Sequence, residues 1–233
     1  ALAALALTAC DEMEPNERFS DPVIVEAKKN VLIEDFTGQQ CMNCPLAAEE
    51  IHKLQEAYGA DRLIAVSVHG GSNALSETKS PQGLANAQGN AYVTHWGVTS
   101  FPKGWVDRSG SIDDKEKWAE TIKNRFNITP KVDIKVVSHG YTADANGVET
   151  IKLTINVIGK HNATGKLQVW LTENNVVKYQ LMGDGTRNLN YEHNHVFRAS
   201  ISAPYGDELA VSEGESISKD YEYKFPDFST LKN

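Results

Sequence analysis

Hydrophobic and polar positions follow two different rhythms along the 233 residues, and the change between them comes near residue 130. In the first part, short runs of branched apolar residues predict buried strands at 31–36, 62–68 and 103–107. Between these runs, apolar residues recur every third or fourth position, as they do on one face of a helix. The helical stripes comprise Ala47, Ile51, Leu54 and Tyr58, then Leu84, Ala87, Ala91 and His95, and then Trp118, Ile122 and Phe126. Alternating strands and helices predict an α/β fold for this part.

From Lys131 onward every second residue is apolar in one run after another, and turn sequences separate the runs. The clearest runs and turns are 132–136, 151–157, 167–171 and 221–225, with turns at 144–147 and 183–185. About six strands without a helix are typical of an immunoglobulin-like β-sandwich, which we expect at 131–233. No closing strand is visible at 228–233, so either a last strand is missing or something else covers the open edge.

The composition is that of an ordinary globular protein, with 40% hydrophobic and 23% charged residues. The net charge of −8 comes without any basic stripe. An acidic chain of this kind is a poor partner for nucleic acid and for electrostatic docking on anionic lipid. We therefore expect no nucleic-acid partner.

The first ten residues form an apolar run that is too short to span a bilayer. Its end, Leu7–Cys10, resembles a bacterial lipobox, in which the cysteine is lipidated and becomes the mature N-terminus. The alternative is an N-terminal core helix that carries a free cysteine. We expect residues 1–10 to be the remnant of a signal peptide, residues 11–29 to be an acidic tether, and Cys10 to anchor the protein to a membrane.

Once the lipobox cysteine is set aside, the chain has one pair, Cys41 and Cys44, spaced Cys-x-x-Cys. A disulfide that closes so small a loop adds little stability, and no second pair exists to complete a zinc site. Exported proteins tolerate disulfides, so we interpret the pair as a redox centre without metal or other cofactor. At a helix N-terminus, Cys41 would be the exposed attacking thiolate, and Cys44 the buried resolving cysteine.

Three features together, Asp35, the Cys41–Cys44 pair and Pro102, resemble the thioredoxin-fold oxidoreductases. The resemblance implies that Asp35 is a buried acid that assists proton transfer. It also implies that the bond before Pro102 is cis and that this proline faces the cysteines across the site. The predicted fold class is therefore an α/β thioredoxin-like domain at 30–128 followed by an all-β immunoglobulin-like sandwich.

The same resemblance implies a substrate groove beside the cysteines, formed by Gln40, Met42, Asn43 and Phe101. Gln40 departs from the family, which usually has an aromatic residue at that position. The two residues between the cysteines do not allow the reduction potential of the pair to be predicted. The direction of electron flow therefore stays open among reductase, oxidase and isomerase.

A second resemblance covers nearly the whole chain. The lipobox, the run Phe36–Pro45 and the later stretch Tyr191–Val196 resemble the 28-kDa outer-membrane lipoprotein family of Bacteroides-type bacteria. The resemblance implies a lipid-anchored outer-membrane protein, facing either the periplasm or the cell surface. Two functions follow as expectations. One is thiol–disulfide exchange with protein or peptide thiols, and the other is a non-catalytic surface lipoprotein for adhesion or ligand binding.

His193 and His195 flank Asn194 in a predicted strand or at its entry. On a strand, residues i and i+2 share one face and could bind a metal ion together. No third ligand is visible in the sequence. We therefore interpret both as histidines held by hydrogen bonds in the β-rich part.

Overall fold

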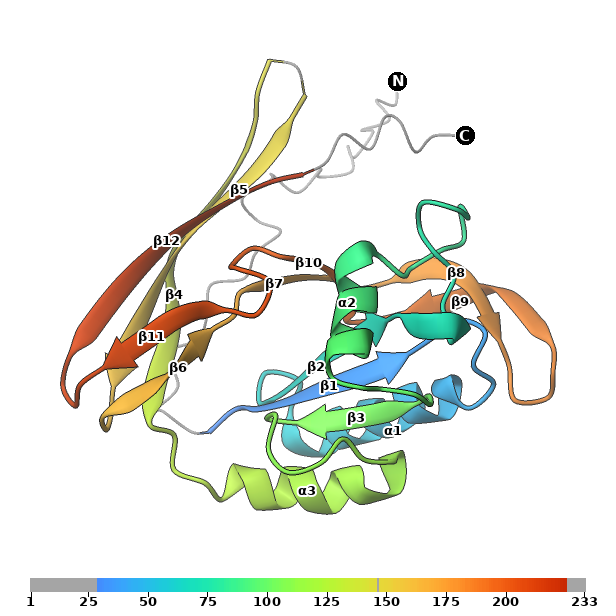
Figure 1. Ribbon diagram of the computed structural model, residues 1–233, viewed down its shortest axis with the longest axis horizontal. Coiled ribbons are helices and arrows are strands. Elements are labelled where there is room, and N and C mark those ends of the chain that lie inside the picture. Colours follow the sequence, from blue (N-terminus) through green and yellow to red (C-terminus); the bar gives the residue numbers. More distant parts are fainter. Residues whose placement is uncertain (1–28, 146, 226–233) are drawn as a thin grey trace, which may run out of the picture.

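The computed structural model describes residues 29–145 and 147–225, and a five-stranded sheet lies at its centre (Figure 1). Its two middle strands, β1 (Val31–Thr37) and β2 (Leu63–His69), run parallel in register. Strand β3 (Lys103–Val106) pairs antiparallel with β1 on one side. On the other side, β10 (Val196–Ser200) pairs with β2, and β7 (Trp170–Glu173) completes the order β3-β1-β2-β10-β7. The sheet therefore joins segments from both parts of the sequence.

Helices cover both faces of this sheet. Helix α1 (Cys44–Tyr58) and helix α3 (Trp118–Phe126) pack on one face, and α2 (Ala87–His95) packs on the other. Two short 3₁₀ turns, Gly71–Asn73 and Lys115–Lys117, precede α2 and α3. Pro45 occupies the first turn of α1, where its missing N–H is no loss. The helix ends at Gly59, whose φ of 92° is readily adopted only by glycine.

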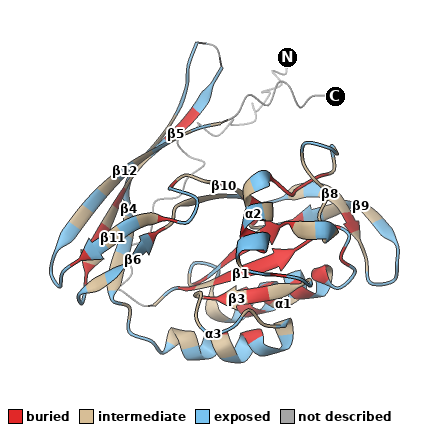
Figure 2. Cartoon of the chain, viewed as in Figure 1, coloured by how far each residue is buried: buried red, intermediate tan, exposed pale blue. Residues whose placement is uncertain are grey.

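The remaining strands form three small sheets. The largest has the order β12-β5-β4, and the two others are the pairs β11-β6 and β8-β9. The bounds are β4 Val132–Ala143, β5 Glu149–Gly159, β6 Ala163–Leu167, β8 Val176–Leu181, β9 Arg187–His193, β11 Asp207–Val211 and β12 Ser216–Lys224. The three-stranded sheet lies at the left of Figure 1, and the β8–β9 hairpin lies at the right, at the end toward which β1 points. Figure 2 shows buried positions concentrated in β1, β3 and α1, while β4 and β12 are mostly exposed or half-buried.

The predicted fold class, a thioredoxin-like α/β domain followed by an all-β immunoglobulin-like sandwich, is wrong. Of the residues that the structure describes, 43% are strand and 20% helix, with three α-helices and several small sheets. The strands and helices expected at 31–126 are present, but β7 and β10 leave the presumed sandwich and join the central sheet. The reason is physical: period-2 alternation shows that a segment is a strand, but it does not show which sheet the strand joins.

An arginine held among tryptophans helps to fix β7 to the sheet. Arg108 follows β3 and forms an ion pair with Glu34, whose carboxylate is buried on β1, at 2.7 Å. The guanidinium carbon lies 5.1 Å from the ring centre of Trp96, 5.9 Å from that of Trp105 and 5.2 Å from that of Trp170 on β7. Cation–π contacts of this kind add to the apolar packing between strands from the two parts of the chain.

Several predictions fall outside the described residues. They are the signal remnant at 1–10 with its lipidation site Cys10, the tether up to residue 28, and the chain end at 226–233. Among the helices that the structure describes, none combines the length and apolar character needed to cross a membrane.

Candidate functional site

One face of the central sheet changes character along β1 and β2. Alternate residues of both strands point toward α1, because successive side chains of a strand face opposite sides. At the start of the strands these residues are apolar and belong to one core cluster, namely Val31, Ile33, Leu63 and Ala65. Farther along, the same alternation gives Asp35, Thr37, Ser67 and His69. We call the first set the apolar half and the second set the polar half of this face.

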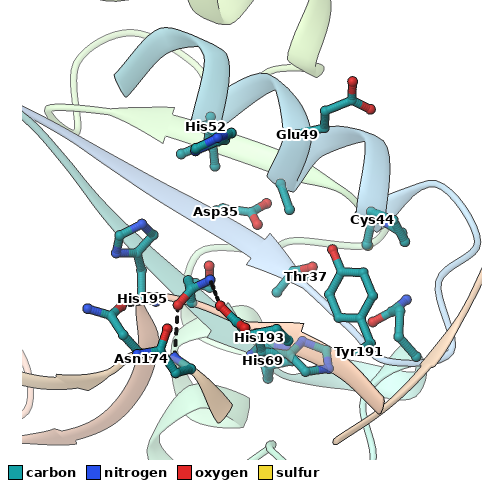
Figure 3. A pocket seen from close by; sticks show the side chains of 18 of the residues that line it. Asp35, Thr37, Cys44, Glu49, His52, His69, Asn174, Tyr191, His193 and His195 are labelled. Atoms are coloured by element: carbon teal, nitrogen blue, oxygen red, sulfur yellow. Dashed lines mark hydrogen bonds between the residues drawn. The ribbon is translucent and has the colours of Figure 1, made fainter. Parts of the chain in front are cut away.

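A cavity of about 510 Å³ lies over the polar half (Figure 3). All four residues of the polar half line it, and α1 contributes Cys44, Ala48 and Gln55. The other wall comes from β8 and β9 and the neighbouring loops, with Gln180, Tyr191, His193, Asn174 and His195 among its residues. Because ligands of α/β sheets bind beyond the carboxyl ends of parallel strands, this is the expected place for a binding site.

Asp35 is the buried acid that the sequence predicts. Only 1% of its surface is exposed, and burial raises the pKa of its carboxyl group to about 8. Within the described part of the chain, its Oδ1 atom has no hydrogen-bond partner. At neutral pH, Asp35 is therefore a protonated acid that faces the cavity.

Three of the four histidines that line the cavity are electrically neutral at neutral pH. Burial lowers the pKa of His69 to about 3 and that of His193 to about 4, and it also lowers the pKa of His195. The rings of His69 and His193 meet edge to face with their centres 5.3 Å apart. His193 Nε2 lies 3.3 Å from the carbonyl oxygen of Tyr179, and His195 Nε2 lies 3.2 Å from Oε1 of Gln55.

One nitrogen in this group is left open. The Nδ1 atom of His69 is buried and lacks a hydrogen-bond partner among the residues that the structure describes. We call Asp35 Oδ1 and His69 Nδ1 the two open atoms. The described residues also contain no group of three or more His, Cys, Asp or Glu side chains arranged to hold a metal ion.

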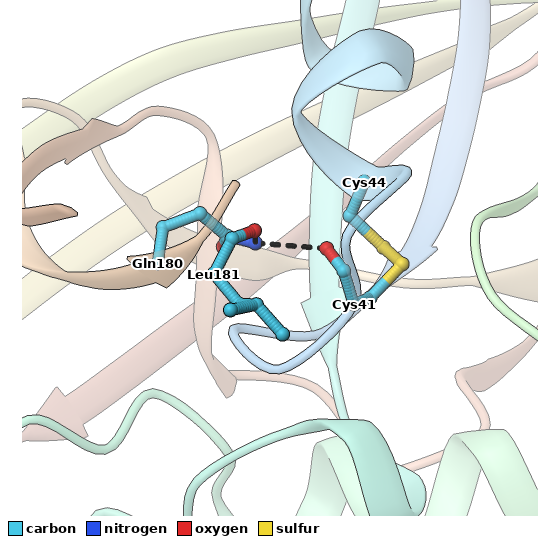
Figure 4. Close-up of a disulfide and its surroundings, with 4 residues drawn as sticks. All are labelled: Cys41, Cys44, Gln180 and Leu181. Carbon is cyan, nitrogen blue, oxygen red and sulfur yellow. Dashed lines mark hydrogen bonds between the residues drawn. A yellow bond between two sulfur atoms is a disulfide. The ribbon is translucent and has the colours of Figure 1, made fainter. Parts of the chain in front are cut away.

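Cys41 and Cys44 form a disulfide at the start of α1 (Figure 4). Cys44 lines the cavity, but both residues are buried, with exposures of 5% for Cys41 and 3% for Cys44. The predicted exposure of Cys41 is thus not observed. The carbonyl oxygen of Cys41 accepts a hydrogen bond from Gln180 Nε2 at 3.0 Å, so strand β8 lies against the disulfide loop.

A second set of contacts joins the same loop to β8. The backbone N–H of Leu181 donates to the carbonyl oxygen of Gln39 at 2.8 Å. The side-chain Nε2 of Gln39, a fully buried residue, donates to the carbonyl oxygen of Tyr179 at 3.1 Å. The loop before Cys41 is therefore held in place by β8, which lies about 140 residues later in the sequence.

The predicted groove residues are not gathered at the cavity. Gln40, Met42 and Asn43 are exposed around the disulfide loop, and none of them lines the cavity. The Phe101–Pro102 peptide bond is cis, which confirms that expectation. Phe101 packs against the apolar cluster on the opposite face of the sheet, so its observed contacts are those of a core residue.

The structure thus brings together Asp35 and Cys44, but it adds residues that sequence reasoning did not assign to the site. These are Gln55, His69, Tyr191, His193 and His195. A signal for the site was present in the sequence. A buried strand whose inward positions turn polar at its carboxyl end, as in β2, indicates a face that is not packed against a helix.

Comparisons with known proteins give a family and a fold. Residues 89–233 match the family model described as outer membrane protein Omp28. Among solved structures, the chain is similar to HBP35 of Porphyromonas gingivalis, with 24% identity and a TM-score of 0.60 over 84% of this chain. The chain spans 64% of the length of that structure. A protein from Agrobacterium tumefaciens is 14% identical with a TM-score of 0.48, over 84% of this chain and 80% of that one. No curated protein matches.

Proposed function

The chain belongs to the Omp28 family of outer membrane proteins. We propose that it is a surface protein that binds a small polar ligand in the cavity over the polar half. In this proposal the protein is not an enzyme. The cavity is its functional site, and the disulfide is a structural clasp at the edge of that site.

The two open atoms carry this proposal. Buried polar atoms in folded proteins almost always have a hydrogen-bond partner, and each exception calls for an explanation. An unpaired buried polar group costs about 1–3 kcal/mol. Both open atoms belong to residues that line a cavity large enough for a small molecule. A bound ligand would supply the missing partners.

The burial of both cysteines supports the structural role of the disulfide. A disulfide that exchanges with a protein thiol must admit the attacking sulfur atom. Cys41 and Cys44 are both almost fully buried, and the backbone of Cys41 is bound to Gln180. The clasp fixes the loop that precedes α1 and, through it, the position of Cys44 on the cavity wall.

We further propose that Cys10 is lipidated and anchors the protein in the outer membrane. The support is the lipobox-like sequence at Leu7–Cys10 together with the family. When the full chain is expressed in a bacterium with an outer membrane and fed radiolabelled palmitate, the protein should become labelled. Cys10→Ser should remove the label. Protease treatment of intact cells should digest the protein if it faces the cell surface. An unlabelled wild-type chain would contradict the anchor, and a protected one would contradict surface exposure.

A thermal-shift screen tests ligand binding. The full chain is mixed with classes of small polar molecules, namely amines, sugars, amino acids and carboxylates. One class should raise the melting temperature in a saturable manner. Ala48→Trp, on the cavity side of α1, should abolish the shift because the indole fills the cavity. Ala57→Trp, also exposed on α1 but outside the cavity lining, is the matched control and should leave the shift unchanged.

Two results would contradict the proposal. One is the absence of a saturable shift with every class. The other is a shift that survives Ala48→Trp, because the ligand would then bind elsewhere on the molecule.

Thiol–disulfide exchange with protein or peptide thiols is a second candidate function. The observation that favours it is that Asp35 and Cys44 line the same cavity. In this mechanism two electrons and two protons pass between a dithiol and a disulfide. They go from a substrate dithiol to the Cys41–Cys44 disulfide in the oxidising direction, or from the reduced cysteine pair to a substrate disulfide in the reducing direction. Asp35 would move a proton, and Pro102 would shape the substrate groove.

A trapping experiment separates the two candidates. With Cys44→Ser, any exchange should leave mixed disulfides on Cys41 that are visible on non-reducing gels. The ligand-binding proposal predicts no such adducts and no reduction of insulin by the full chain. Accumulated adducts would favour the second candidate.

A further inference from the structure

Resting on the ligand-binding function proposed above, the charge and hydrogen-bonding pattern of the cavity point to a chemical class of ligand. We propose that the cavity binds a small organic cation whose primary ammonium group pairs with Asp35 and reaches His69.

The charges on the cavity wall favour a cation. Among the described residues that line the cavity, three are acidic, namely Asp35, Glu49 and Glu192, and none is Lys or Arg. Lys53 lies outside the lining and forms an ion pair with Glu49 at 2.7 Å, so part of the charge on Glu49 is compensated. Glu192 has no such ion pair within the part of the chain that the structure describes. Asp35 carries a proton in the ligand-free protein and becomes negative when a bound cation makes it release that proton to solvent. A wall of this composition attracts positive ligands and repels anions.

The two open atoms match the donors of an ammonium group. Such a group carries three donors and no acceptor. His69 is neutral, and in the tautomer that carries its proton on Nε2 the lone pair of Nδ1 accepts a hydrogen bond. Asp35 offers Oδ1 and, once it gives up its proton, a full negative charge. A buried carboxylate is costly without a partner and becomes favourable beside a cation that hydrogen-bonds to it.

The position of Asp35 leaves room for such a ligand. Figure 3 shows its carboxyl group between α1 and the side chains of His69 and His193, and all three residues line the cavity. The neighbouring imidazoles are neutral, so they do not repel a cation. Within the described residues, no group of ligating side chains is arranged for a metal ion, which favours an organic cation over a metal cation.

Isothermal titration with three four-carbon molecules tests the charge requirement. Putrescine carries two ammonium groups, 1,4-butanediol replaces them with hydroxyls, and succinate replaces them with carboxylates. The full chain should bind putrescine at least about tenfold more tightly than the diol, since a charge-assisted hydrogen bond adds about 1.5 kcal/mol or more. Succinate should not bind.

Two variants locate the ammonium group. Asp35→Asn keeps the shape of the side chain but removes its charge, and it should weaken putrescine binding by about tenfold or more. Asp61→Asn changes an exposed acid outside the cavity lining and should leave the affinity unchanged. Circular dichroism should show that both variants are folded. The comparison of the three molecules on the wild-type chain needs neither variant.

The outcomes separate this inference from the function on which it rests. If the diol or succinate binds as well as putrescine, or if putrescine does not bind at millimolar concentration, the cation assignment is wrong. The ligand-binding function then still stands or falls with the thermal-shift screen and Ala48→Trp. Equal putrescine binding by wild type and Asp35→Asn would also overturn the assignment.

Discussion

The apolar and polar halves of the α1-facing sheet surface lie on the same two strands, yet they are organised by different requirements. In the apolar half, Val31, Ile33 and Leu63 are fully buried against α1 and α3, as the packing of a core demands. Farther along the two strands, Asp35 and His69 are also buried, but they line a cavity. Folding alone would favour apolar residues at these positions. The change from apolar to polar residues therefore marks where core packing ends and the proposed binding site begins.

The two halves also differ in what closes them. Helices from the first part of the chain cover the apolar half. The polar half is closed by β8 and β9, which are far away in the sequence. Gln180 reaches Cys41 across 139 positions. The site therefore depends on long-range contacts that the core beneath it does not need.

The largest expected effect comes from making the apolar half polar. Ile33→Asp places a carboxyl group in the apolar core, outside the lining of the cavity, and we expect a loss of about 4 kcal/mol or more in the free energy of unfolding. Urea denaturation followed by circular dichroism measures the loss. The reciprocal change, Asp35→Ile, should leave the stability equal or higher. If the two substitutions destabilise equally, the two halves do not differ as described.

The second effect concerns pH. The pKa of Asp35 is raised to about 8 by burial, so the folded state holds this proton more tightly than the unfolded state does. The stability that the proton provides is present in acid and is lost as the pH rises toward the folded pKa. Between pH 5 and pH 7, the wild type should therefore lose about 1.4 kcal/mol per pH unit relative to Asp35→Asn.

Urea unfolding of both proteins across this pH range measures the difference. Asp61→Asn is the control and should follow the wild type at every pH. Parallel curves for the wild type and Asp35→Asn would mean that the carboxyl of Asp35 is not shielded from water.

The third effect comes from reduction of the disulfide. Cys41 and Cys44 are three positions apart, and closing so small a loop contributes about 2 kcal/mol in the chain-entropy model. Reduction should lower the melting temperature by about 4–8 °C for a chain of this length. The double variant Cys41→Ser/Cys44→Ser should melt at the reduced temperature and should not respond to reductant. An unchanged melting temperature would contradict the role of a clasp.

The smallest effect concerns the contact between β8 and the disulfide loop. Gln180→Leu removes the hydrogen bonds from Nε2 to the carbonyl oxygens of Cys41 and Leu181, at a cost of about 1 kcal/mol. Hydrogen–deuterium exchange should become faster in β8 and in the loop before α1, but not in the apolar half. Faster exchange throughout the sheet would show that the contact supports the whole fold.

The sequence predicts the local parts of this arrangement well. Its apolar stripe identifies α1 together with its end at Gly59, and the branched runs identify β1 and β2. These elements follow from the residues within them. The motif also shows that Cys41 and Cys44 are close enough to bond, because they are three positions apart, and their Cα atoms lie 5.4 Å apart.

The arrangement of the strands in sheets and the assembly of the site depend on contacts between distant segments, which hydrophobic periodicity does not specify. A strand such as β10 has the same alternation whether it joins a sandwich or the central sheet, and that ambiguity produced the wrong fold class. The burial of Cys41 follows from its contact with β8, which no local pattern predicts. His69 and His193 become neighbours only when β2 and β9 are brought together, so the sequence does not place them in one site.

The most direct test of the polar half is the titration of Asp35 itself. The ¹³C NMR signal of its carboxyl carbon, assigned by comparison with Asp35→Asn, reports its protonation state in the ligand-free protein. We predict a midpoint near pH 8, as expected for a buried acid whose Oδ1 has no hydrogen-bond partner among the described residues. A midpoint near pH 4, the range of a solvated aspartate, would show that water or a partner already satisfies this group and would contradict the proposed site.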